Sequence, residues 1–131
     1  MVIDTSALVA ILRAESDAEA FARAIADADV CRLSAASYVE VGAVIVGSRD
    51  PIASRRVDDL LEAARIRIEP VSPDQAAIAR AAYRDFGKGG GHPAGLSFGD
   101  CFAYALVRVM NEPLLFKGED FARTDVRSAL P

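Results

Sequence analysis

The sequence MVIDTS at residues 1–6, followed by ALVAIL at residues 7–12, decides the fold of this chain. Three apolar residues, one acid and two hydroxyl residues precede an apolar run with helical spacing. This pattern predicts a short buried strand that passes into a helix at Asp4. In open α/β sheets, ligands bind at the carboxyl ends of the strands. Asp4 is therefore a candidate site residue, and the other acids of the site should lie near it.

The composition indicates one globular domain spanning residues 1–131. With 52% hydrophobic residues, the chain is large enough to bury a core without disulfides or structural metals. Cys31 and Cys101 form neither a CxxC pair nor a zinc-binding spacing, so both are expected to be core thiols. No apolar run approaches the roughly 18 residues of a membrane span, and no basic segment precedes the first apolar residues. We therefore expect a cytoplasmic protein without membrane contact.

The net charge of −4 disfavours a broad basic face that grips nucleic acid non-specifically. The 15 basic residues are nonetheless almost all arginines, whose guanidinium groups suit bidentate phosphate contacts. Locally basic surface beside an acidic pocket is therefore compatible with this composition. The candidates for such contacts are Arg49, Arg55, Arg56, Lys88 and Lys117, and ordinary solvated surface is the alternative interpretation of each of them.

Predicted strands alternate with predicted helices along the whole chain. Besides residues 1–3, strands are predicted at residues 30–33, 66–71 and 114–116. After the first helix, further helices are predicted at residues 17–29, 34–45, 57–64, 72–86 and 97–111, with a glycine-rich loop at residues 87–95. Capping boxes are expected at Ser16/Glu19 and Ser72/Gln75. The alternation predicts a parallel sheet that helices cover on both faces.

Further acids fall at the same edge of the predicted sheet as Asp4. Glu40 is predicted in the first turn of the helix after the second strand, and Asp100 in the first turn of the helix before the fourth. Glu119 and Asp120 follow the fourth strand. Helix starts and strand ends share one edge of a parallel sheet, so these carboxylates can converge there. Convergent like charges are destabilising unless a cation neutralises them, and an all-oxygen site favours Mg²⁺ or Mn²⁺.

The same spacings also have a purely structural interpretation. Ser37-x-x-Glu40 and Ser97-x-x-Asp100 both have the pattern of a capping box, and Asp4 alone can be an N-cap. Acidic side chains in the first turn of a helix stabilise it by about 0.3 to 1 kcal/mol through the helix dipole. From spacing alone, helix capping and metal binding are equally supported for Glu40 and Asp100.

Other kinds of active site fit the sequence poorly. An aspartic-protease turn would place Asp4 between β-strands, whereas a helical pattern follows it here. A catalytic triad would require His92, the only histidine, which lies in the glycine-rich loop. Gly87-Lys88 lacks the upstream glycine spacing and the following hydroxyl residue of a phosphate-binding loop. The aromatic residues fall at helical core positions, so no exposed stacking surface for RNA bases is predicted.

Four segments, in order along the chain, match a known pattern: residues 2–8 (VIDTSAL), 38–40 (YVE), 96–105 (LSFGDCFAYA) and 114–121 (LLFKGEDF). Together they extend over nearly the whole chain and resemble the PIN-domain ribonucleases of the VapC-like toxin type. The resemblance implies a three-layer α/β/α fold with a short parallel sheet of four to five strands. It also implies an endoribonuclease that depends on Mg²⁺ or Mn²⁺ and hydrolyses RNA phosphodiester bonds.

The resemblance further implies partners and site residues. Proteins of this type are toxins of type II toxin–antitoxin systems and are usually homodimers, and a cognate antitoxin blocks the site. By this similarity Asp4, Glu40 and Asp100 are the catalytic, metal-binding acids, and Asp120 is the fourth.

One position departs from the family pattern. The family often has two acids after the fourth strand, in the arrangement T-x-D-x-D-F, and Gly118 takes the place of the first of them. The sequence leaves open whether Glu119 replaces the missing acid.

Two alternatives belong to other functional classes. A PIN-like domain without catalysis would use its acids to cap helices and would bind RNA or a protein partner, and Gly118 supports this interpretation. A receiver-type domain would accept a phosphoryl group on Asp4, but no suitable lysine or hydroxyl switch residue can be placed at the expected strand ends.

Overall fold

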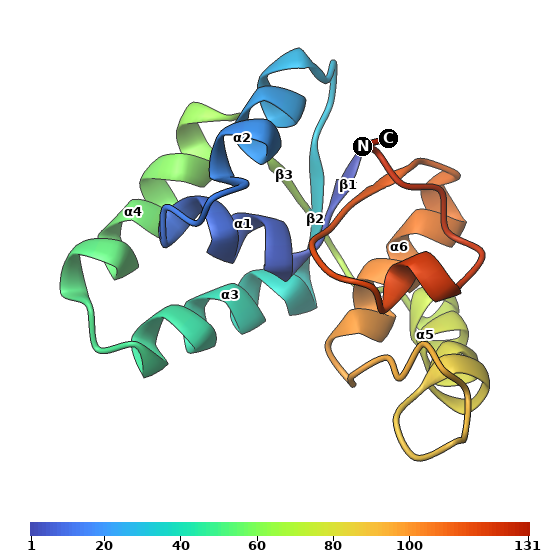
Figure 1. Ribbon diagram of the computed structural model, residues 1–131. Coiled ribbons are helices and arrows are strands. Elements are labelled where there is room, and N and C mark those ends of the chain that lie inside the picture. The colour runs from blue at the N-terminus through green and yellow to red at the C-terminus, as the bar shows by residue number, and fades with distance from the viewer.

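The computed structural model describes all residues from 1 to 131 and contains a four-stranded sheet. The strands are β1 (Val2–Ile3), β2 (Arg32–Ser34), β3 (Arg67–Glu69) and β4 (Leu114–Leu115). They pair in the order β3-β2-β1-β4, and every pairing is parallel. The predicted parallel sheet is therefore confirmed, with β1 between β2 and β4 (Figure 1).

Helices cover both faces of this sheet. They are α1 (Thr5–Leu12), α2 (Ala18–Asp27), α3 (Ala35–Gly47), α4 (Pro51–Ala63), α5 (Pro73–Phe86) and α6 (Asp100–Met110), and a short 3-10 helix, η1 (Phe121–Arg123), follows β4. In Figure 1, α1 to α4 lie on one side of the sheet and α5 and α6 lie on the other. The three-layer α/β/α architecture is thus confirmed. None of these helices combines the length and the apolar composition that a transmembrane segment requires.

Side chains of the two central strands point alternately into two hydrophobic cores. Ile3 and Leu115 belong to the core packed by α1 to α4, whereas Val2 and Leu114 belong to the core packed by α5 and α6. All four side chains are fully buried. Because successive residues of a strand point to opposite faces, even two-residue strands hold both helical layers on the sheet. Asp4 is the first residue beyond β1.

Local signals fix most helix ends. Ser72 Oγ accepts a hydrogen bond from the Gln75 N–H at 3.1 Å, as predicted, although the Gln75 side chain donates to the Pro70 carbonyl instead of completing the box. Asn111 ends α6 in the left-handed conformation, with φ of 52°. The capping box predicted at Ser16/Glu19 is wrong. Helix α2 begins after Asp17, and no side chain caps it.

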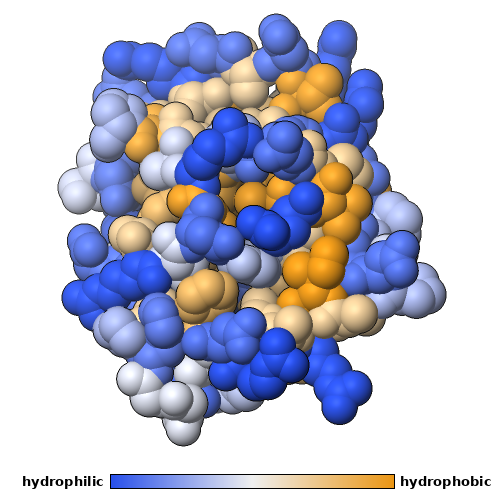
Figure 2. Space-filling model, turned by 90° about the vertical axis from the view of Figure 1, so that its right-hand side faces the viewer, coloured by the Kyte–Doolittle hydropathy of each residue, from blue (hydrophilic) through white to orange (hydrophobic).

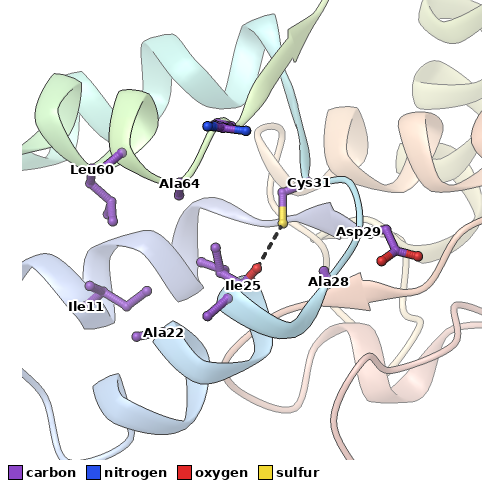
Figure 3. A pocket seen from close by; sticks show the side chains of 11 residues that line it. Ile11, Ala22, Ile25, Ala28, Asp29, Cys31, Leu60 and Ala64 are labelled. Atoms are coloured by element: carbon purple, nitrogen blue, oxygen red, sulfur yellow. Dashed lines mark hydrogen bonds between the residues drawn. The ribbon is translucent and has the colours of Figure 1, made fainter.

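Both cysteines are buried free thiols, as predicted. Cys31 borders a hollow of about 450 Å³ between α1, α2 and α4, and its Sγ–H donates to the Ile25 carbonyl at 3.7 Å (Figure 3). Burial raises the pKa of Cys31, and it raises the pKa of Cys101 to about 11. Neither thiol is therefore a reactive nucleophile at neutral pH.

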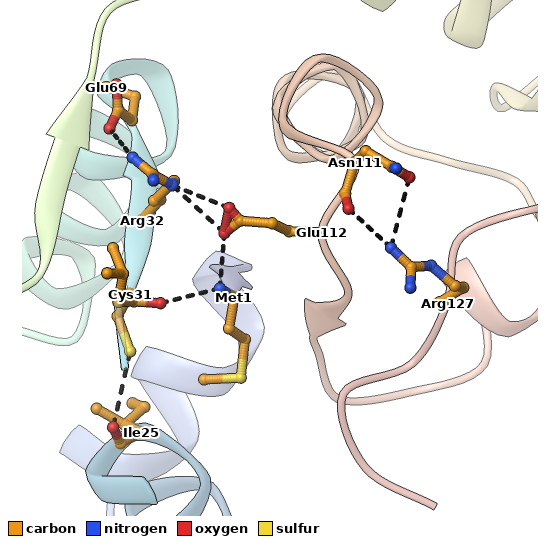
Figure 4. A network of polar contacts seen from close by, with 9 residues as sticks. Met1, Ile25, Cys31, Arg32, Glu69, Asn111, Glu112 and Arg127 are labelled. Atoms are coloured by element: carbon orange, nitrogen blue, oxygen red, sulfur yellow. Dashed lines mark hydrogen bonds and ion pairs between the residues drawn. The ribbon is translucent and has the colours of Figure 1, made fainter. Parts of the chain in front are cut away.

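A network of charged groups joins β1, β2 and β3 to the segment before β4 (Figure 4). The Glu112 carboxylate accepts from the Met1 amino group at 2.7 Å and pairs with Arg32 at 2.9 Å, and Arg32 also bonds to Glu69 at 2.7 Å. Burial alone would raise the pKa of Glu112, but the hydrogen bonds from Met1 and Arg32 outweigh it and lower that pKa. The network therefore stabilises the fold whenever Glu112 is ionised.

We expect Glu112→Gln to lower the free energy of unfolding at pH 7 by about 1 to 2 kcal/mol, since it leaves partly buried cations without their shared anion. The difference should disappear as the pH falls through the lowered pKa of Glu112, where the wild-type carboxyl group is also protonated. Urea denaturation at pH 7 and pH 3 measures both values. Glu19→Gln, which removes the exposed ion pair with Arg23, is the matched control and should change little. Equal effects of the two variants would contradict this role of Glu112.

Candidate active site

Asp4 caps helix α1 at the carboxyl end of β1 and is almost completely buried, with 3% of its surface exposed. Its Oδ2 atom accepts hydrogen bonds from the Ser6 N–H at 3.0 Å and from the Ser6 Oγ–H at 2.6 Å. The other oxygen, Oδ1, is buried and has no hydrogen-bond partner. A buried carboxylate oxygen without a partner is destabilising. Asp4 therefore offers one free ligand atom to a cation.

The surroundings of Asp4 disfavour its charged form. Burial is the main cause that raises the pKa of Asp4 from 3.8 to about 7. The charges of Asp100 and Glu40 act in the same direction, whereas the hydrogen bonds from Ser6 oppose it. A cation at this place would favour the carboxylate form.

Asp100 is the first residue of α6, and a capping box forms there. Its Oδ2 atom accepts from the Ser97 N–H at 2.9 Å, and Ser97 Oγ accepts from the Asp100 N–H at 3.2 Å. Burial raises the pKa of Asp100 and the charge of Asp120 adds to the effect, whereas Ser97 and Lys88 act to lower it. Capping occupies only one carboxylate oxygen, so it leaves the other available to a cation.

Glu40 lies in the second turn of α3, not in the first turn as predicted, because Ser34 caps this helix by accepting from the Ala36 N–H. Ser37 Oγ is buried without a partner, so the capping box proposed for Ser37 and Glu40 does not form. The Glu40 carboxylate makes no hydrogen bond or ion pair, and it lies against Gly99 at the start of α6. Helix capping therefore does not explain this acid.

Asp120 is exposed and lies between β4 and η1. Its charge contributes to the raised pKa of Asp100, and it makes no side-chain hydrogen bond. Glu119 is also exposed and is not among the main charges acting on Asp4 or Asp100. Gly118 has φ of 102°, a conformation that favours glycine over an acid. The structure thus gives a backbone reason for the departure from the family pattern.

The four acids come from distant segments of the chain and interact electrostatically at one edge of the sheet. Asp100 interacts with both Asp4 and Asp120, and Glu40 interacts with Asp4. None of the four forms a salt bridge with an arginine or lysine.

This donor set fits a hard divalent cation. No three carboxylates stand close enough to surround an ion in this arrangement. Mg²⁺, however, usually binds one or two carboxylates directly and keeps several waters. The unpartnered Asp4 Oδ1 and the unpaired Glu40 carboxylate suit such an ion.

Two of the basic residues considered for RNA contacts lie near these acids. Lys117 follows β4, but its Nζ is bound to Glu15 at 2.6 Å and to Asp17 at 3.2 Å. The charge of Lys88 acts on Asp100, and its ammonium group is in no ion pair. Lys88 is therefore better placed than Lys117 to contact a phosphate. Arg49, Arg55 and Arg56, at the start of α4 and just before it, also form no ion pair.

Two supporting residues were not apparent from the sequence. Ser6 Oγ donates to Asp4 and accepts from the Lys117 N–H at 3.0 Å, so it links the ends of β1 and β4. A hydroxyl residue two positions after an N-cap acid is the available signal for such a link. No sequence pattern indicates the contact between Gly99 and Glu40, because the two residues are far apart along the chain.

The sequence of this chain matches a known family and several known proteins. A family model described as PIN domain matches residues 1–127. Ribonuclease VapC28 of Mycobacterium tuberculosis is 59% identical over 130 residues, covering 99% of this chain and 98% of that protein. Ribonuclease VapC of Mycolicibacterium smegmatis is 52% identical over 126 residues, covering 96% and 97%.

Two solved structures share the fold. VapC20 of M. tuberculosis, described as a toxin that cleaves the sarcin–ricin loop, superimposes with a TM-score of 0.76 at 17% identity and covers 95% of each chain. A toxin–antitoxin complex from Klebsiella pneumoniae contains a chain with a TM-score of 0.69 at 20% identity, covering 92% of this chain and 89% of that one. At these identities the two structures show a shared fold and nothing more. The family is shown by the match to the family model and by the relatives with 52% and 59% identity. The chain belongs to the PIN-domain family, in the group of the VapC proteins.

Proposed function

We propose that this protein is a divalent-metal-dependent endoribonuclease that acts in the cytoplasm as the toxin of a toxin–antitoxin pair. The observation that carries the proposal is the set of unpaired acids around Asp4, whose buried Oδ1 lacks any partner in the protein. Relatives of this sequence that are named ribonucleases support RNA as the substrate. In this proposal Mg²⁺ or Mn²⁺ is held by Asp4, Glu40, Asp100 and Asp120.

The residues of the site have distinct roles in this proposal. A bound Mg²⁺ or Mn²⁺ supplies the positive charge that polarises the scissile phosphodiester and makes water a better nucleophile. Asp4 offers Oδ1 to the ion, while Ser6 fixes the orientation of the carboxylate through Oδ2. Asp100 offers the oxygen that its capping box leaves free. Glu40 and Asp120, which have no protein partners, would hold the ion directly or through water.

The charge of the site also explains why the chain is acidic. Four carboxylates repel RNA when no cation is bound, so the phosphate contacts must come from beside the pocket. Lys88 meets this condition, because its charge reaches Asp100 without forming an ion pair. The proposal therefore assigns Lys88 to the RNA backbone.

Expression in cells tests the proposed function. The chain should arrest growth when it is expressed alone, and co-expression of the neighbouring gene, which the family resemblance implies to encode the antitoxin, should restore growth. Mapping of RNA ends in the arrested cells should show new cleavage sites that are missing when Asp4→Asn replaces the wild-type protein. Growth arrest by both forms, without new RNA ends, would favour the alternative of a binding module.

Two exposed apolar surfaces support protein partners. The first is a hollow of about 260 Å³ between α3 and α4, where Val39 and Val46 are 69% and 66% exposed. The second is a hollow of about 290 Å³ between α5 and α6, where Phe98 is 74% exposed. Figure 2, which views the molecule from the α5 and α6 side of Figure 1, shows hydrophobic patches among hydrophilic residues. We assign the first surface to the antitoxin, because it begins beside Glu40, and the second to a second copy of the chain.

Val46→Glu should weaken binding of the neighbouring gene product by about tenfold or more, since it places a charge in an apolar contact. RNA cleavage by the free toxin should remain unchanged, because Val46 lies about one and two-thirds turns of α3 beyond Glu40. Titration with the purified partner measures the affinity. Val109→Glu, on exposed α6 surface, is the matched control. If both substitutions lower the affinity equally, or if neither lowers it, the antitoxin binds elsewhere on the protein.

A further inference from the structure

We propose that Gly99 is a positioning residue of the active site, because its missing side chain provides the space in which the Glu40 carboxylate reaches the start of α6. The inference rests on the proposed function and concerns how one of its acids is held. Gly99 immediately precedes Asp100. A change at Gly99 therefore acts between two of the four carboxylates.

The backbone conformation does not require glycine at this position. Gly99 has φ of −63° and ψ of −38°, which are ordinary right-handed helical values. Any L-residue adopts them, and alanine favours a helix more than glycine does. Gly118 is the opposite case in the same chain, since its φ of 102° favours glycine while a Cβ atom there would meet nothing within 4 Å. The reason for Gly99 must therefore be space.

That space is filled by Glu40. A Cβ atom on Gly99 would lie 2.6 Å from the Glu40 Cδ and 2.9 Å from its Oε1, closer than real Cβ atoms approach other heavy atoms. The obstructing group is the end of a flexible side chain and not backbone. A methyl group at Gly99 would therefore push the carboxylate aside, while α3 and α6 keep their positions.

Displacement of Glu40 matters because nothing else holds its carboxylate. Glu40 makes no hydrogen bond or ion pair in the structure, and its charge acts on Asp4 from the position against Gly99. Residues that orient a metal ligand typically change metal affinity by about 10- to 100-fold when they are substituted. Gly99→Ala should therefore weaken metal binding while leaving the stability of the metal-free protein equal or higher.

A double-mutant cycle tests this inference. The variants are Gly99→Ala, Glu40→Asp and the combination of both, with Gly47→Ala as control. Gly47 lies on the same helix as Glu40, and a Cβ atom there meets nothing within 4 Å. The dissociation constant of Mn²⁺, the melting temperature without metal and the rate of RNA cleavage are measured for each protein.

We expect Gly99→Ala to raise the Mn²⁺ dissociation constant and to slow cleavage by about tenfold. Aspartate at position 40 has a side chain one methylene shorter than glutamate. In the Glu40→Asp background, Gly99→Ala should therefore change the Mn²⁺ dissociation constant by less than about twofold. Gly47→Ala should leave all three quantities unchanged or raise only the melting temperature.

Three results would overturn the role assigned to Gly99: the same loss of affinity in both backgrounds, a lower melting temperature with unchanged Mn²⁺ affinity, or no effect at all. Failure of the proposed function is recognised separately. In that case the wild-type protein itself neither binds Mn²⁺ nor cleaves RNA, whereas a wild-type protein that does both, beside an unaffected Gly99→Ala variant, rejects only the inference about Gly99.

Discussion

Asp4→Asn should lower the rate of RNA cleavage by about 10² to 10³-fold or more, because it removes the buried charged ligand at the centre of the site. The amide oxygen can still accept the hydrogen bonds that Ser6 donates to Oδ2, so helix α1 should remain capped. Single-turnover cleavage of a labelled RNA with Mg²⁺ or Mn²⁺ measures the effect. Circular dichroism of the same samples establishes that the fold is retained.

Asp74→Asn is a matched control for this experiment. Asp74 lies in the first turn of α5, so it shares the helix-start position of Asp100 but is not among the site acids. Its substitution should leave the cleavage rate within about twofold. Asp100→Asn should behave like Asp4→Asn. Full activity of both site variants in the presence of metal would mean that these acids only cap helices.

The stability of the metal-free protein should fall as the pH rises from about 4 to about 7. The pKa of Asp4 is about 7 in the folded protein, whereas the usual value of an aspartate, which applies to the unfolded chain, is 3.8. Between these two values the folded state therefore holds a proton that the unfolded state has already released. Its favourable contribution is complete below pH 3.8, declines through this window and is lost above pH 7. At about 1.4 kcal/mol for each pH unit, the decline can reach about 4 kcal/mol.

The difference in free energy of unfolding between wild type and Asp4→Asn reports the titration of Asp4 together with its coupling to Asp100 and Glu40, because groups that do not interact with Asp4 cancel. Between pH 5 and pH 8, the free energy of unfolding of Asp4→Asn should rise relative to that of wild type, as measured by urea denaturation without metal. At pH 8, Mn²⁺ should stabilise the wild-type protein and have little effect on the variant. A difference that stays constant with pH would show that the pKa of Asp4 is the same in the folded and unfolded states, and would contradict its desolvation.

The architecture followed from the sequence because its strands are marked by short apolar segments at the ends of helical patterns. Val2 and Ile3 must both be apolar, since their side chains enter opposite cores, and this makes the strand recognisable despite its length. Helix ends were less predictable where several hydroxyl residues compete. Ser34 rather than Ser37 caps α3, and Asp17 precedes α2 without forming a cap, because tertiary packing decides among equivalent local options.

The site was predictable only in part. Asp4 and Asp100 stand at a strand end and a helix start, where local patterns are informative. Glu40 was expected in the first turn of its helix, where it does not lie, and its carboxylate lies against Gly99 on another helix. Single-sequence patterns carry information over a few residues, whereas this contact joins distant segments. The same limit explains why Lys117 looked available for RNA although Glu15 and Asp17 bind it.

The most direct test of a shared cation is anomalous diffraction from crystals grown with Mn²⁺. We predict a peak within direct coordination distance of Asp4 Oδ1 and within direct or water-mediated reach of Asp100, Glu40 and Asp120. Crystals that contain Mn²⁺ elsewhere, with Asp4 Oδ1 still unpartnered and the other three carboxylates pointing away from it, would contradict the account.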